Sequence, residues 1–179
     1  MSHRRSITML GGALLSALPL GAQQHEHVSP YADLQDREIK ALSEADVEAL
    51  LTGEGMGTAL PAELHGYPGP RHVLDLGSEL ALTEAQRSAV EAVFQAMRDR
   101  AVELGRQIVE LERELDALFA ARTITPQELD RLVGAIGSRR AELRTVHLRA
   151  HLELEPILTH EQRARYAHLR GYEHHRTPG

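Results

Sequence analysis

The sequence predicts an all-α protein built on a long antiparallel helical hairpin with shorter flanking helices. Aromatic residues are only 3% of the 179-residue chain, so the core has to be aliphatic, whereas β-sandwiches favour aromatic and β-branched residues. From residue 84 onward, apolar residues alternate at spacings of four and three, which is typical of a helix with one apolar seam. The seam consists of Val90, Phe94, Met97, Ala101, Leu104, Ile108, Leu111, Leu115 and Leu118.

A short turn joins this helix to a second one. The first helix is expected from about Glu84 to Arg122. Thr125 then has the character of an N-cap, with Pro126 at the first helical position and Glu128 completing a capping box. The second helix is expected to end at about residue 155, because a proline follows. The short connection predicts that the two helices are antiparallel neighbours.

The first 22 residues have the features of a signal peptide. Arg4 and Arg5 precede an uncharged, mostly apolar stretch that is too short to span a bilayer, and Ala22 is a plausible last residue before cleavage. We therefore expect export to the periplasm. No other stretch is long and apolar enough for stable membrane insertion.

The rest of the chain divides by composition. We expect a flexible leader over residues 23–33, short helices and a Gly/Pro-rich loop over 34–81, the hairpin domain over 82–172, and a flexible tail over 173–179. Ser43 is the expected N-cap of a short helix that Gly53 ends. The density of glycine and proline over residues 53–81 argues against a regular helix there, and the role of this loop is open.

Several function classes are disfavoured. The net charge of −6 argues against nucleic-acid binding, and the absence of cysteine excludes disulfides, thiolate metal sites and thiol catalysis. The sequence has no HExxH motif, no G-x-S-x-G motif and no P-loop, so we do not expect an enzyme or a required cofactor.

One short motif, Leu-Thr-x-x-Gln, occurs twice and brackets the predicted hairpin. Its local physics is a capping box, because the threonine hydroxyl accepts from the helix backbone and the glutamine side chain reaches back to the threonine amide. Each copy alone is therefore also consistent with an ordinary helix start. The motif residues are Leu82, Thr83 and Gln86 in the first copy, and Leu158, Thr159 and Gln162 in the second.

Two such motifs around a long hairpin, in an exported chain, resemble the LTxxQ family of periplasmic proteins. This family includes the Spy/CpxP chaperones and the related ZraP and CnrX-type heavy-metal sensors. The resemblance covers roughly residues 78–172. It implies a cradle-like helical fold that is usually dimeric and has no catalytic residues.

The resemblance leaves three functions open. The first is an ATP-independent envelope-stress chaperone that binds unfolded or misfolded envelope proteins. The second is a periplasmic accessory protein that binds or senses Zn, Cu or Ni, with a sensor protein as partner. The third is a structural interaction module.

Four apolar residues of the first long helix lie outside the seam: Val93, Val102, Val109 and Phe119. A two-helix hairpin cannot bury both the seam and this second set of apolar residues. We therefore expect an apolar surface that remains for clients or for a homodimer.

Histidines supply the candidate metal ligands. His147 and His151 are four residues apart on one helix, so their imidazoles can share one Zn, Cu or Ni ion. A His-x-x-x-His pair also resembles part of the site in the CnrX-type sensors. Antiparallel pairing places the two histidines near Gln95 and Asp99, with Met97 close by. The alternative is that His147 is a core-boundary residue and His151 is solvated.

The two ends of the mature chain carry further histidines. His25 is third from the expected new N-terminus, where an amine, two amides and an imidazole form a square-planar Cu(II) or Ni(II) site. His174 and His175 give the tail a metal-binding character. The alternatives are a polar leader and an exposed tail without ligands.

Overall fold

The computed structural model describes residues 29–172. The chain divides into two compact units, residues 1–33 and 34–179, and the α-helices described below belong to the second. A 3₁₀ turn, η1 (Ala32–Leu34), is followed by three short helices, two long ones and a last short one. They are α1 (Glu44–Thr52), α2 (Leu60–Leu64), α3 (Pro70–Asp75), α4 (Glu84–Ala120), α5 (Pro126–Leu154) and α6 (His160–Leu169).

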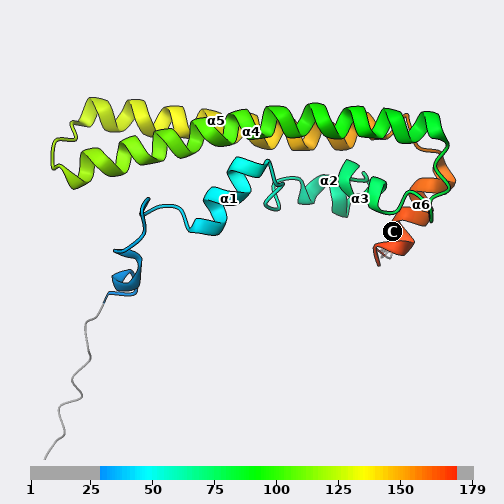
Figure 1. The fold of residues 1–179 in the computed structure, drawn as a ribbon, viewed down its shortest axis with the longest axis horizontal. Helices are drawn as coiled ribbons and strands as arrows, with labels where there is room; N and C mark the ends of the chain where they lie inside the picture. The colour runs from blue at the N-terminus through cyan, green and yellow to red at the C-terminus, as the bar shows by residue number, and fades with distance from the viewer. Residues whose placement is uncertain (1–28, 173–179) are drawn as a thin grey trace, which may run out of the picture. The chain divides into compact units, whose positions relative to one another are not determined.

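The long hairpin consists of α4 and α5, which run antiparallel and lie side by side (Figure 1). The caps follow the predicted chemistry, since Thr125 accepts from the Glu128 amide and the Glu128 carboxylate accepts from the Thr125 amide. With no strand among residues 29–172, the predicted all-α hairpin fold is confirmed. None of the described helices is long and apolar enough to cross a membrane.

Helix α1 packs against α4 through the first of two core clusters. Ser43 caps α1 together with Asp46, and Gly53 ends it with a left-handed φ of 75°, as expected. The helices approach so closely at Gly105 that a Cβ there would lie 1.9 Å from the Leu50 carbonyl oxygen. The cluster contains Ile39, Leu42, Leu50, Ala101, Leu104, Ile108, Val109 and Leu143.

The apolar residues outside the seam are largely covered by the N-terminal segment. Val109 is buried in the first cluster, Val102 lies against Gly53, and Val93 packs on the second cluster. Phe119 alone among the four is mostly exposed, at 54%. The exposed apolar surface that could bind clients or a second copy of the chain is therefore smaller than the sequence predicts.

The expectation that residues 53–81 form no regular helix is wrong. Proline stands in the first turn of both α2 and α3, where a missing backbone N–H costs no helical hydrogen bond. Val73 of α3 is fully buried and anchors the segment in the second core cluster. That cluster joins Val73, Leu80, Val90, Leu154, Leu158 and Tyr166. The segment is thus packed beside the hairpin, along the side where α1 also lies (Figure 1).

The two Leu-Thr-x-x-Gln motifs meet in space. Both form the predicted capping boxes, at Thr83 and at Thr159. In addition, Gln86 Nε2 donates to Gln162 Oε1 at 2.8 Å, and Gln162 Nε2 donates to Gln86 Oε1 at 3.0 Å. The motif therefore both starts two helices and joins the start of α4 to the start of α6.

Candidate metal site

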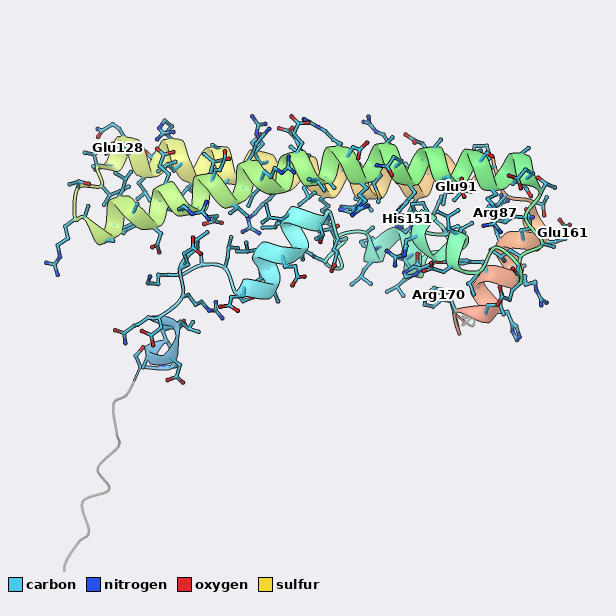
Figure 2. The ribbon with its side chains drawn as sticks, in the orientation of Figure 1. Arg87, Glu91, Glu128, His151, Glu161 and Arg170 are labelled. Atoms are coloured by element: carbon cyan, nitrogen blue, oxygen red, sulfur yellow. The ribbon has the colours of Figure 1, made fainter. Side chains whose placement is uncertain are left out.

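His147 and His151 lie on the face of α5 that turns toward the N-terminal segment. Their exposures are 4% and 7%, so the alternative of a solvated His151 is excluded. Both line a pocket of about 880 Å³ between the hairpin, the Gly-rich segment after α1, and helices α2 and α3. In Figure 2, His151 lies where the hairpin meets α2 and α3, and Arg170, which lines the same pocket, lies at the end of α6.

The ring of His151 is oriented by a backbone carbonyl. Its Nδ1 lies 2.7 Å from the Tyr67 carbonyl oxygen. A carbonyl only accepts, so Nδ1 carries the proton and donates it, and the Nε2 of a neutral ring has a free lone pair. Histidines that bind metals commonly have one nitrogen fixed in this way, which leaves the other to ligate.

His147 has a buried nitrogen without a partner. Its Nε2 is shielded from solvent and makes no hydrogen bond within residues 29–172. Burial lowers the pKa of the imidazole below its usual value, and the nearby His151 lowers it further. His147 is therefore neutral at pH 7, which is the form that binds metals. Gly55 lies beside the ring, where a Cβ would be 3.8 Å from Nδ1.

Three acidic residues line the pocket, Glu54, Glu63 and Asp75, and of these only Glu63 of α2, at 7% exposure, is buried. Its Oε1 accepts from the Tyr166 hydroxyl at 2.5 Å and from the Tyr172 hydroxyl at 3.1 Å, and Arg170 Nε lies 3.5 Å away. Its Oε2 lies 3.7 Å from His151 Nδ1 and has no hydrogen bond in the described structure. Two buried polar atoms in one pocket, His147 Nε2 and Glu63 Oε2, thus lack hydrogen-bond partners in the described structure.

Gly69 keeps space open between the carboxylate and the imidazole. A Cβ at this position would lie 3.3 Å from Glu63 Oε2 and 3.4 Å from His151 Nε2. Its backbone, with φ −85° and ψ 141°, suits any residue, so the conformation does not call for glycine here. The missing side chain leaves a space bordered by Glu63 Oε2 and His151 Nε2, which we call the cradle.

A family model described as "Heavy-metal resistance" matches residues 56–165, which is more than half of the chain. The chain belongs to the heavy-metal resistance family. This confirms the resemblance to the Spy/CpxP, ZraP and CnrX-like periplasmic proteins, a non-enzymatic family. No curated protein and no solved structure matched the chain. The matched range contains both Leu-Thr-x-x-Gln motifs, Glu63 and the histidine pair.

The fit of a heavy metal to this pocket is supported by the nitrogen and oxygen donors and by the two buried polar atoms that lack hydrogen bonds in the described structure. Within residues 29–172, however, no three His, Asp or Glu side chains are already assembled at metal-binding spacing. His147, His151 and Glu63 line the pocket as separate donors, and these side chains would have to move closer together to share one ion.

The neighbours expected from helix pairing are partly different. Met97 lines the pocket, but Gln95 Nε2 donates to Asp99 Oδ1 on an exposed face of α4. The carboxylate that lies beside the histidines is Glu63. Glu63 comes from the Gly/Pro-rich segment, which has no helical periodicity that would place its side chains on a face. The sequence alone therefore shows an acidic residue there but not its position beside the histidines. His25, His174 and His175 lie outside the described residues.

Proposed function

We propose that this member of the heavy-metal resistance family is a periplasmic accessory protein that binds a divalent transition metal in the pocket of His147, His151 and Glu63. The observation that carries the proposal is a pair of buried polar atoms without hydrogen-bond partners in the described structure, His147 Nε2 and Glu63 Oε2, in a pocket that also contains His151. A buried polar atom without a partner costs about 1–3 kcal/mol. A cation shared by these atoms would offset that cost.

The donor set favours Zn, Cu or Ni over alkaline-earth ions. Imidazole nitrogen suits these transition metals, whereas Ca and Mg prefer an all-oxygen shell. Two imidazoles and one carboxylate leave a position for water or for a further ligand from the protein. Such a protein would buffer metal in the periplasm or report it to a sensor partner.

The test is a thermal melt of wild type and of His147→Ala/His151→Ala, each with and without Zn²⁺, Cu²⁺ or Ni²⁺. A ligand that binds only the folded state raises the melting temperature, by an amount set by its affinity. We expect a metal-induced rise in wild type that the double variant lacks. The control is His160→Ala/His168→Ala, which removes two exposed histidines of α6. Equal shifts in all three proteins, or no shift in wild type, would overturn the proposal.

Chaperone activity is the second candidate. It is favoured by exposed apolar side chains at the closed end of the hairpin, namely Phe119, Leu129 and Val133 at 54%, 36% and 51% exposure. Unfolded envelope proteins would bind there without nucleotide. The test is light scattering from a heat-stressed client, with wild type compared with Phe119→Ser/Val133→Ser. An unchanged rate of client aggregation with excess wild type would exclude this function.

The proposed location follows from the first 22 residues and from the periplasmic family. Cleavage near Ala22 would release a mature protein that starts near Gln23. Intact-mass measurement of protein from a periplasmic extract checks this, and retention of Met1 would contradict it.

A further inference from the structure

The two oxygens of the Glu63 carboxylate have different surroundings. Oε1 accepts two phenol hydroxyls, from Tyr166 at 2.5 Å and Tyr172 at 3.1 Å, and lies 3.5 Å from Arg170 Nε. Oε2 is buried and has no hydrogen bond in the described structure. A carboxylate oxygen has two lone pairs in its plane, so Oε1 is fully engaged and Oε2 is open.

The open oxygen faces the histidine pocket. Oε2 lies 3.7 Å from His151 Nδ1 and borders the cradle at Gly69. Both phenols come from the C-terminal part of the chain, Tyr166 from α6 and Tyr172 from the turn after it, while Glu63 comes from α2. The C-terminal segment thus sets the rotation of a side chain that belongs to the N-terminal segment.

The phenols act as donors and not as ligands. Burial raises the pKa of the Tyr166 hydroxyl far above its usual value, and the hydrogen bond to Glu63 raises it further. The Tyr166 hydroxyl is therefore protonated at neutral pH. Because a phenol is neutral, the two hydroxyls orient the carboxylate without adding positive charge to that of Arg170, whose Nε lies 3.5 Å from Oε1.

We propose that Tyr166 and Tyr172 are positioning residues that present Glu63 to the metal through Oε2 alone, an inference that rests on the proposed function. We call this pair of phenols the tyrosine clamp. A one-oxygen carboxylate with two imidazoles gives the low coordination number that Zn²⁺ and Co²⁺ accept in proteins. Ca²⁺ needs six to eight oxygens and commonly takes carboxylates in bidentate fashion, which an engaged Oε1 does not allow. The tyrosine clamp therefore adds to the preference for Zn²⁺ over Ca²⁺ that the two histidines already set.

The experiment compares wild type with Tyr172→Phe and Tyr166→Phe in the full chain. The matched control is Tyr67→Phe, because Tyr67 meets the site through its backbone carbonyl. Zn²⁺ affinity is measured by competition with a chromogenic chelator, Ca²⁺ binding by calorimetry, and ligand geometry by the visible spectrum of the Co²⁺-loaded protein. Outer-shell partners of metal ligands typically affect affinity by about 10- to 100-fold.

We expect each clamp variant to lose about 10-fold or more in Zn²⁺ affinity and to show a weaker Co²⁺ spectrum as Glu63 becomes bidentate. The Tyr67→Phe control should match wild type. Tyr172→Phe removes one hydroxyl from a partly exposed residue near the end of the described chain, so it keeps the test valid if Tyr166→Phe folds poorly.

Wild-type Zn²⁺ affinity and Co²⁺ spectrum in both variants, even with lower melting temperatures, would assign the phenols a purely structural role and overturn the inference. Absence of Zn²⁺ binding by wild type would instead refute the proposed function on which it rests.

Discussion

Replacing Gly69 by alanine adds one methyl group to the cradle and removes no ligand. The new Cβ would lie 3.0 Å from His151 Cε1 and 3.3 Å from Glu63 Oε2. Ordinary van der Waals contact begins at about 3.4 Å, so the imidazole and the carboxylate would each have to move by a few tenths of an ångström. The metal would then lose the space between its oxygen and nitrogen donors.

The fold should tolerate the same change. Gly69 has an extended backbone that alanine adopts without strain, and replacing glycine at such a position stabilises a protein by about 0.4–1 kcal/mol through the unfolded state. We therefore expect the metal-free unfolding free energy to change by less than about 1 kcal/mol. Zn²⁺ affinity should fall on the order of 10-fold, the size seen when the surroundings of a ligand are disturbed.

Calorimetric titration with Zn²⁺ and denaturant melts of the metal-free protein measure the two effects separately. Gly134→Ala is the matched control, because a Cβ there meets no atom within 4 Å. If Gly69→Ala binds Zn²⁺ as tightly as wild type does, the space beside Glu63 and His151 is not part of a metal site.

Three further outcomes are expected. Gly105→Ala should lower the unfolding free energy by about 3 kcal/mol or more, because the new Cβ would lie 1.9 Å from the Leu50 carbonyl oxygen. Denaturant melts measure this loss. An unchanged unfolding free energy would contradict the close packing of α1 on α4. Without metal, stability should fall as the pH drops below about 6.5, because the unfolded chain takes up a proton that folded His147, with its lowered pKa, resists. His147→Gln should make that dependence shallower in pH-series melts, with the remainder due to His72, whose pKa burial also lowers; an unchanged dependence would refute the role of His147. A double-mutant cycle on Gln86→Ala and Gln162→Ala should give a coupling of about 0.5–3 kcal/mol, since the two amides bond to each other, whereas additive effects would exclude a net contribution from the pair.

The parts of the structure that the sequence predicts are those set by local physics. Helix caps such as Thr125 with Glu128 depend on residues three apart. The seam of α4 depends on a repeat within one helix. Both can therefore be predicted without knowledge of the tertiary structure. The histidine pair is of the same kind, because residues four apart on a helix share a face.

The features that were missed depend on contacts between distant segments. Glu63 reaches the histidines because α2 packs beside α5, and Tyr166 reaches Glu63 from 103 residues further along the chain. Proline is a helix breaker in the interior of a helix, whereas Pro61 and Pro70 stand in the first turns of α2 and α3, where proline is favoured. The pairing of Gln86 with Gln162 likewise requires the ends of the hairpin domain to meet.

X-ray absorption at the zinc edge of the Zn²⁺-loaded protein tests the central claim most directly. The account predicts a first shell with two imidazole nitrogens and one carboxylate oxygen at about 2.0–2.2 Å. The imidazole scattering should disappear in His147→Ala/His151→Ala and persist in His160→Ala/His168→Ala. A shell made only of oxygen, or an imidazole signal that survives loss of the α5 pair, would contradict a metal site at His147, His151 and Glu63.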